Sequence, residues 1–288
     1  MFQGSMVALV TPFIKGRVDK VALKKLLDFH LANGTDVLVP CGTTGESATL
    51  SHEEQKRVLS FVKDYIGDRI PVICGAGSNN TEEAIELAKH AKKIKAAGIL
   101  SVCPYYNKPT QEGIYRHYET IAKKVNIPIV LYNVPGRTVI SMAPETVARL
   151  SKIDNVVAIK EASGSLEQVS AIMNLCKLDV LSGDDSLTYP MMALGAKGCI
   201  SVTANIMPKE VHDMCQAALE GNFETARKIH FKLFDINKAM FIESNPVPVK
   251  TALMLMKKIK GEVRLPLCEM RRENYDKLRT VLRKYKLI

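Results

Sequence analysis

The chain has 288 residues, of which 47% are hydrophobic and 24% are charged. This is an ordinary globular composition, long enough for one large domain or two smaller ones. The N-terminus, MFQGSMVALVTPF, has no basic segment followed by a long apolar run, and no window of about 18 apolar residues occurs. We therefore expect neither a signal peptide nor a membrane span.

The net charge of +10 does not indicate a nucleic-acid partner. Lysine and arginine are spread over helical faces beside glutamate and aspartate, and no nucleic-acid-binding motif accompanies them. The densest basic segment, RRENYDKLRTVLRKYK, keeps a helical apolar stripe of Leu278, Val281, Leu282 and Tyr285. It is typical of a solvated helix.

The cysteine pattern favours a reducing compartment. Seven cysteines are present, and Cys41, Cys74, Cys103 and Cys199 lie inside apolar runs. They are typical of small, reduced core residues. We expect a cytoplasmic protein without disulfides.

Short β-rich apolar runs recur along the chain, separated by amphipathic segments with helix signals. Ser51 and Glu54 form the pattern of a capping box before the helical segment HEEQKRVLSFVKDYI, and Gly98 is placed as the C-cap of TEEAIELAKHAKKIKAAG. The eight predicted strands are residues 6–13, 37–42, 72–77, 99–106, 129–135, 156–163, 179–185 and 199–206.

Strand followed by helix, repeated in this way, predicts an α/β protein built as a parallel (β/α)₈ TIM barrel. We expect barrel strands and helices in residues 1–206, and the last barrel helix with a C-terminal helical extension in residues 207–288. The alternative is a doubly wound sheet. Its dinucleotide fingerprint is missing, because the segment that begins Gly75-Ala76-Gly77 lacks the third glycine and follows the third strand.

One predicted strand carries a lysine. Lys160 follows the apolar run 156–159, and it is the only lysine within the predicted strands. By the two-residue period it shares a face with Val156, Ala158 and Ala162, whose small alanines leave room for a long side chain. An amine held away from water is partly neutral, and a neutral amine attacks carbonyl groups. The alternative is a surface lysine at a strand end.

Hydroxyl groups at other strand ends complete a candidate site. Tyr132 shares a face with Val130 and Val134 on the neighbouring strand, so it can point to the same end of the barrel. Schiff-base formation needs protons moved on and off the substrate, and a phenol with a hydroxyl partner can do this. Thr43, Thr44 and Tyr106 are candidate partners. A tyrosine alone is more often a half-buried aromatic, but beside Lys160 the catalytic interpretation is favoured.

Two absences narrow the chemistry further. None of the six histidines lies at a strand end beside carboxylates, so we expect no metal and no cofactor. Asp184 and Asp185 follow the seventh strand, where many barrels bind phosphate, and two carboxylates repel a phosphate. We therefore expect a non-phosphorylated acid as substrate.

The segments GTTGES, CPYYNKP, LYNVPGRT, IKEASG, LSGDD and NPVPVK together resemble the dihydrodipicolinate synthase family. The resemblance covers the whole chain in order, and Arg137 in LYNVPGRT is its most specific mark within the wider group of Schiff-base pyruvate lyases. It implies condensation of pyruvate with L-aspartate 4-semialdehyde, the first step of the diaminopimelate branch of lysine synthesis. It also implies a homotetramer made of two tight dimers.

The resemblance implies a role for each matching residue. Lys160 would form the Schiff base, and Tyr132, Thr43 and Tyr106 would form a proton relay, with Tyr106 reaching into the site of a neighbouring subunit. Thr44 would hold the pyruvate carboxylate near the carbonyl of Ile200. Arg137 would bind the carboxylate of the aldehyde substrate.

The resemblance also implies an effector site for L-lysine between subunits. Weak to moderate inhibition is expected, because Gln55 stands where some inhibited relatives carry a histidine. The matching positions are Ser47, Ala48, His52, Asn79, Glu83 and Tyr105.

Two other functions remain open at this level. Another pyruvate lyase, such as N-acetylneuraminate lyase or a 2-keto-3-deoxy sugar acid aldolase, would share the lysine, but a sugar chain would favour neutral partners where Arg137 stands. A non-catalytic barrel that senses a ligand would be favoured if the lysine or a relay tyrosine were missing, and all are present.

Overall fold

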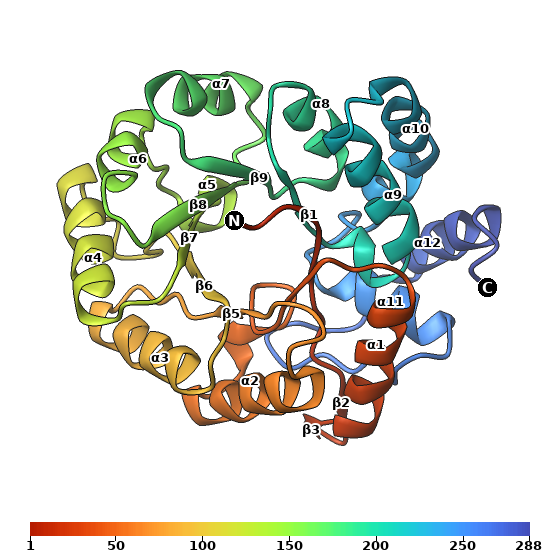
Figure 1. Cartoon of the computed structure of the whole chain (residues 1–288). Coiled ribbons are helices and arrows are strands. Elements are labelled where there is room, and N and C mark those ends of the chain that lie inside the picture. The colour runs from red at the N-terminus through yellow and green to blue at the C-terminus, as the bar shows by residue number, and fades with distance from the viewer.

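The structure, a computed structural model, describes all 288 residues. Eight parallel strands form one sheet in the order β4-β1-β10-β9-β8-β7-β6-β5, and a parallel bridge between Leu38 and Val72 joins the two outer strands into a barrel. The predicted (β/α)₈ barrel is confirmed, and Figure 1 shows the helices around it. The barrel strands are β1 (Gly4–Ala8), β4 (Val37–Val39), β5 (Ile73–Gly75), β6 (Gly98–Val102), β7 (Ile129–Asn133), β8 (Val156–Glu161), β9 (Asp179–Ser182) and β10 (Gly198–Ser201).

The strands are shorter than the sequence predicts, mostly at their C-terminal ends. The fourth strand, for example, stops at Val102, so Tyr105 and Tyr106 lie in the loop that follows it. Buried apolar residues continue past several strands, such as Leu9 and Val10 after β1 and Cys103 after β6. The continuing apolar pattern therefore hides the true strand ends.

Helices cover the outside of the barrel, and side-chain caps mark where several of them begin. The Ser51–Glu54 capping box is present at the start of α2, as predicted. The predicted end of α3 is wrong, because the helix stops at Lys93 and Gly98 begins β6 instead. The barrel helices are α1 (Lys20–Ala32), α2 (His52–Ile66), α3 (Thr81–Lys93), α4 (Gln111–Lys124), α6 (Pro144–Leu150), α7 (Leu166–Leu175), α8 (Thr188–Ala193) and α9 (Pro208–Leu219).

Several short elements were not predicted. A two-stranded hairpin of β2 (Phe13–Ile14) and β3 (Arg17–Val18) separates β1 from α1. Four short helical turns follow barrel strands: η1 (Ser47–Thr49), α5 (Pro135–Thr138), η2 (Asp185–Leu187) and η3 (Thr203–Asn205).

The C-terminal extension is helical, as predicted. It comprises α10 (Phe223–Ala239), α11 (Val247–Leu255) and α12 (Arg272–Lys284). Helix α10 packs against α9, and α12 packs against α10 and α11 (Figure 1). Leu278 and Leu282 of the predicted stripe on α12 are fully buried. The boundary expected between residues 206 and 207 falls just before α9.

The core has two parts. A large cluster lies between the strands and the helices, and a smaller one fills the barrel with inward side chains such as Val130, Tyr132 and Ala158. Val156, which we expected on the inward face with Lys160, packs in the outer cluster instead. The reason is a register shift after Ile129, which pairs with Val156, whereas Val130 pairs with Ala158.

All seven cysteines are free thiols, and the four in apolar runs are buried. No helix combines the length and the apolar character needed to cross a membrane.

Candidate active site

A cavity of about 370 Å³ lies at the C-terminal end of the barrel, where sites occur in this fold. Its walls come from the ends of several barrel strands and from the loop between α10 and α11. The lining residues are Ala8, Val39, Gly42, Thr43, Thr44, Leu100, Tyr132, Val134, Gly136, Arg137, Lys160, Ala162, Gly183, Asp184, Val202, Phe241, Ser244 and Asn245.

Lys160 and Tyr132 meet in this cavity. They are register partners on β8 and β7, and the Lys160 Nζ lies 4.4 Å from the centre of the Tyr132 ring. Both residues are buried, with 5% and 6% of their surface exposed. A side chain on Gly183 would place its Cβ 2.9 Å from the Lys160 Cε. The glycine therefore makes the space through which Lys160 enters the cavity.

Two carboxylates, Asp184 and Asp185, follow β9, but only one of them lines the cavity with Lys160. Asp184 lines the cavity, and burial raises its pKa although Lys160 acts in the opposite direction. Asp185 does not line the cavity. Its carboxylate accepts hydrogen bonds from the Ser201 hydroxyl and from the Val202 and Thr203 amides, and burial raises its pKa. We expected both carboxylates to repel a phosphate in the site. Only Asp184 lines the cavity, because the Asp185 carboxylate is bound to the loop after β10.

Glu161, next to Lys160, has a structural role in the end of β8. It accepts hydrogen bonds from Asn133 Nδ2 at 2.9 Å and from the Ser163 amide at 2.8 Å. The pKa of Glu161 is raised, because burial outweighs the opposite effect of these hydrogen bonds. The contacts tie the ends of β7 and β8 together, and so they fix the two strands that carry Tyr132 and Lys160.

Thr43 and Thr44 enter the cavity on a tight turn after β4. A side chain on Gly45 would meet the backbone nitrogen of Cys41 at 2.8 Å, so the turn can close only with glycine there. Thr44 Oγ1 accepts a hydrogen bond of 3.0 Å from Asn245 Nδ2. Glu46, also in this turn, is buried and receives a hydrogen bond from the Lys250 ammonium group.

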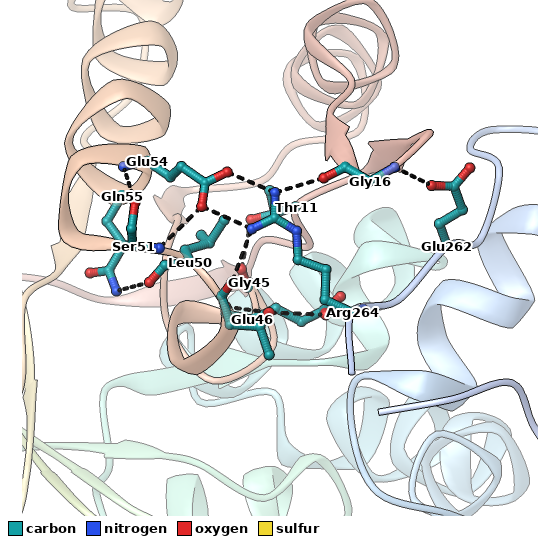
Figure 2. Close-up of polar contacts among 11 residues, drawn as sticks. Thr11, Gly16, Gly45, Glu46, Leu50, Ser51, Glu54, Gln55, Glu262 and Arg264 are labelled. Carbon is teal, nitrogen blue, oxygen red and sulfur yellow. Dashed lines mark hydrogen bonds and ion pairs between the residues drawn. The ribbon is translucent and has the colours of Figure 1, made fainter. Parts of the chain in front are cut away.

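Arg264 of the C-terminal segment forms hydrogen bonds to the same turn and to the η1 turn that follows it (Figure 2). Its backbone amide donates to Glu46, and its guanidinium group donates to both Glu54 oxygens, at 2.7 and 2.9 Å. This contact lowers the pKa of Glu54 to about 2. The turn that carries both threonines is thus fixed by residues more than 200 positions away in the chain.

Arg137 lies on α5 at the exposed edge of the cavity. Its Nη2 donates to the Asn245 carbonyl oxygen at 3.2 Å. It is the one arginine among the residues that line this cavity. A guanidinium group in this place can bind a substrate carboxylate.

Two residues expected at the site lie outside this cavity. Tyr106 is 88% exposed, with a positive φ of 72°, and does not line the cavity of its own chain. Tyr105 is also in this loop and not at the end of a strand. Ile200 packs inside the barrel, and Val202 lines the cavity instead.

A second cavity, of about 320 Å³, gathers most positions of the expected effector site. Ser47, Ala48, His52 and Tyr105 line it. Glu83 lies beside it, with 3.8 Å between His52 Nε2 and Glu83 Oε2, and Asn79 donates to the Tyr105 carbonyl oxygen at 3.0 Å. The second cavity shares Thr43, Val134 and Arg137 with the first.

Sequence reasoning assigned no role to the loop before α11. Phe241, Ser244 and Asn245 line the first cavity, and Asn245 contacts both Thr44 and Arg137. The only signal in the sequence is the segment NPVPVK, which is part of the family resemblance.

Comparison with known proteins decides the family. The model of the dihydrodipicolinate synthetase family matches residues 1–285. The chain belongs to this family. It is 59% identical to the 4-hydroxy-tetrahydrodipicolinate synthase of Geotalea daltonii and 58% identical to that of Geobacter sulfurreducens, in each case over 100% of both chains. It is therefore an enzyme, a lyase with 4-hydroxy-tetrahydrodipicolinate synthase activity, which belongs to the diaminopimelate branch of lysine biosynthesis.

Solved structures of the family agree with this fold. The dihydrodipicolinate synthase of Aquifex aeolicus superimposes with a TM-score of 0.98 at 52% identity, over 99% of both chains. The Acinetobacter baumannii enzyme, solved in complex with pyruvate, has a TM-score of 0.98 at 44% identity over 100% of both chains. The Cyanidioschyzon merolae enzyme, solved with lysine bound, has a TM-score of 0.96 at 40% identity, over 100% of this chain and 99% of that one.

Proposed function

We propose that Lys160 carries the synthase reaction as a Schiff base with pyruvate. The amine attacks the ketone carbon, and the carbonyl oxygen leaves as water. The resulting protonated imine accepts electrons, so the pyruvate methyl group loses a proton and becomes an enamine carbon. That carbon attacks the aldehyde of L-aspartate 4-semialdehyde, and the amine of this second substrate then displaces Lys160 as the ring closes.

The observation that carries this proposal is the burial of the Lys160 amine beside Tyr132 in a cavity that also contains Thr43, Thr44 and Arg137. In the proposal, Tyr132 and Thr43 move protons, with Tyr106 of a neighbouring subunit as the third member of the relay. Thr44 holds the pyruvate carboxylate, with the Ile200 carbonyl near it. Arg137 binds the carboxylate of the aldehyde substrate.

Reduction with borohydride in the presence of pyruvate tests the covalent step. We expect one reduced pyruvyl adduct per chain, on the peptide that contains Lys160, and none in Lys160→Ala. Lys250, which is also fully buried, provides an internal control, because its peptide should stay unmodified. An adduct that persists in Lys160→Ala contradicts the assignment of Lys160, and no adduct in the wild type contradicts the Schiff-base proposal.

Turnover of different aldehydes tests the second substrate. The cavity offers Arg137 as a cation at its edge, which fits the carboxylate of L-aspartate 4-semialdehyde better than the neutral chain of a sugar. We expect condensation with L-aspartate 4-semialdehyde and none with N-acetylmannosamine. The reverse result indicates a sugar acid aldolase.

We infer that L-lysine binds in the second cavity. His52, Tyr105 and the nearby Glu83 supply an aromatic wall, a carboxylate and hydrogen-bonding groups suited to an amino acid. Because the two cavities share Thr43 and Arg137, an effector bound in the second cavity would contact residues of the first.

We also infer that the enzyme is a homotetramer of two dimers. Mass measurement in solution tests this assembly, and a monomer contradicts it.

A further inference from the structure

Asn245 connects the two residues to which substrate binding is assigned. Its side-chain Nδ2 donates to Thr44 Oγ1 at 3.0 Å, and its backbone carbonyl oxygen accepts from Arg137 Nη2 at 3.2 Å. The residue lines the first cavity but is itself 94% buried, since its exposed fraction is 6%. One residue from the loop before α11 therefore contacts both walls of the cavity.

The orientation of the Asn245 amide in this structure sets the direction of the hydrogen bond to Thr44. Nδ2 faces Thr44 and donates, so Thr44 Oγ1 is the acceptor, and the buried Oδ1 of Asn245 has no partner within the chain. No acceptor within the chain takes the hydrogen of the Thr44 hydroxyl. Thr44 lines the cavity, and its hydrogen is free to donate to a group bound there. A carboxylate accepts such a bond, whereas an ammonium group cannot.

A buried ion pair brings the two segments together. Five residues after Asn245, the Lys250 ammonium group donates to Glu46, two residues after Thr44, and both side chains have no exposed surface. The Lys250 amine also lies 4.2 Å from the centre of the Phe13 ring. The backbone amide of Arg264 donates to Glu46 (Figure 2), at the carboxylate oxygen that Lys250 does not contact. Asn245 can reach Thr44 because its segment is anchored at this second point.

We propose that Asn245 is a positioning residue that orients the Thr44 hydroxyl as a donor toward the carboxylate of the first substrate. This inference rests on the proposed function. It separates two roles of one residue: the side chain acts on Thr44, and the backbone carbonyl acts on Arg137. Side-chain substitutions remove the first contact and leave the second in place.

The test compares Asn245→Ala and Asn245→Asp with the wild type, using kcat/KM for each substrate and the pyruvate concentration needed for half-maximal borohydride trapping. A hydrogen bond to a charged group contributes about 10-fold or more in affinity. We expect the half-maximal pyruvate concentration to rise about 10-fold in Asn245→Ala. It should rise further in Asn245→Asp, whose carboxylate takes the Thr44 hydrogen and repels the substrate. In Asn245→Ala, kcat/KM for the aldehyde substrate should change less than kcat/KM for pyruvate.

Asn245→Asp also separates the two possible directions of the bond. If Thr44 donated to Asn245, aspartate would preserve that bond, and trapping at wild-type pyruvate concentrations would overturn the proposal. A double-mutant cycle with Thr44→Val supplies a second measurement: Asn245→Ala should add little to the loss already caused by Thr44→Val. Full additivity of the two losses also overturns it.

Asn237→Ala is the matched control, since Asn237 is a buried asparagine on α10 outside the cavity lining. It should lower thermal stability without changing the pyruvate concentration for trapping. A loss of stability alone in the Asn245 variants would show a purely structural role. Absence of trapping in the wild type would instead reject the proposed function, so the two failures are distinguishable.

Discussion

Tyr132 and Lys160 are paired in register on neighbouring parallel strands, and the Lys160 Nζ lies 4.4 Å from the centre of the Tyr132 ring. Tyr132 is buried, with 6% of its surface exposed, and it lines the first cavity. Its ring packs against the Lys160 amine at the place where we propose that pyruvate binds.

Replacing Tyr132 with phenylalanine should slow the covalent step without disturbing the fold. The ring and its contact with Lys160 stay, and only the hydroxyl group, to which we assign proton transfer, is lost. Such groups contribute about 10²- to 10⁴-fold to rate. We expect pyruvate trapping to slow by that order, with the same final adduct on Lys160.

Tyr118→Phe is the control for this change. The Tyr118 hydroxyl is buried and donates to the Ser101 carbonyl oxygen at 2.9 Å. Its removal should lower stability and leave the trapping rate unchanged. Equal trapping rates in Tyr132→Phe and wild type would contradict a role for Tyr132 in proton transfer.

The sequence predicted the barrel and the residues at its strand ends because those properties are local. Alternation and apolar runs placed Lys160 and Tyr132 on neighbouring strands, and the capping box placed the start of α2. The resemblance then named the reaction. Local patterns also set the limit of the prediction, since the register shift that turns Val156 outward has no signature in the run VVAIKEAS.

Contacts between distant segments could not be predicted from periodicity. Asn245 and Thr44 are 201 positions apart, and Lys250 and Glu46 are 204 apart. Asp185 looked like a carboxylate of the site, but its oxygens are bound by the loop after β10. Such pairings depend on how the C-terminal helices pack on the barrel, and a single sequence contains no direct signal for that.

Arg137→Ala should affect the second substrate far more than the first. Arg137 lies at the exposed edge of the cavity, and its loss leaves Lys160 and Tyr132 in place. A charge-assisted contact corresponds to roughly 10- to 100-fold in affinity. We expect KM for L-aspartate 4-semialdehyde to rise by that factor, while pyruvate still traps on Lys160.

Arg116→Ala serves as the control, because Arg116 forms an exposed ion pair with Glu112 on the outside of the barrel. It should leave both substrates unaffected. If Arg137→Ala used the aldehyde with a normal KM, the guanidinium group would have only a structural role through the Asn245 carbonyl.

Tyr106 should act in the site of a neighbouring subunit. Tyr106 is 88% exposed in the single chain, its backbone has a positive φ, and it does not line the cavity of its own chain. We expect Tyr106→Phe and Lys160→Ala to be inactive alone. Mixed chains should regain part of the activity, because a hybrid dimer contains one site with both residues. No recovery after subunit exchange verified by native mass spectrometry would rule out a shared site.

The second cavity should respond to L-lysine. Glu83 lies between Ser78, whose hydroxyl donates to it at 2.6 Å, and His52. In the proposed effector site, the Glu83 carboxylate accepts hydrogen bonds from the ammonium groups of L-lysine. We expect weak to moderate inhibition of the wild type by L-lysine and weaker inhibition of Glu83→Ala, measured as the concentration that halves the rate.

Glu82→Ala is the matched control, because Glu82 is also in the first turn of α3 but is exposed. It should be inhibited as strongly as the wild type. Equal inhibition of Glu83→Ala and wild type would place the effector elsewhere. No inhibition of the wild type would leave Glu83 as a first-turn residue that favours the helix N-terminus.

Two buried histidines should make the fold sensitive to mild acid. Burial, with a smaller contribution from Lys258, lowers the pKa of His30 to about 3, and burial lowers the pKa of His117 to about 4. Both are neutral in the folded state. The unfolded chain binds their protons near the ordinary pKa of about 6.5. Their contribution to stability is therefore complete above that pH and declines as the pH falls toward the folded values.

Between pH 7 and pH 5 the free energy of unfolding should fall by about 2 kcal/mol for each of these histidines. The raised pKa values of Glu161, Asp184 and Asp185 act in the opposite direction, because these carboxyl groups bind protons more readily in the folded state. The free energy of unfolding of the wild type therefore falls less than the two histidines alone would cause. Comparison of variants at the two pH values isolates each histidine.

Urea unfolding at fixed protein concentration measures the effect. His30→Leu removes a proton-binding group whose Nδ1 contacts Thr35 Oγ1 at 3.0 Å, so it should lower stability at pH 7. Between pH 7 and pH 5, however, the free energy of unfolding of this variant should fall by about 2 kcal/mol less than that of the wild type. A His30→Leu variant with the wild-type pH dependence would show that His30 is not the group that titrates on unfolding.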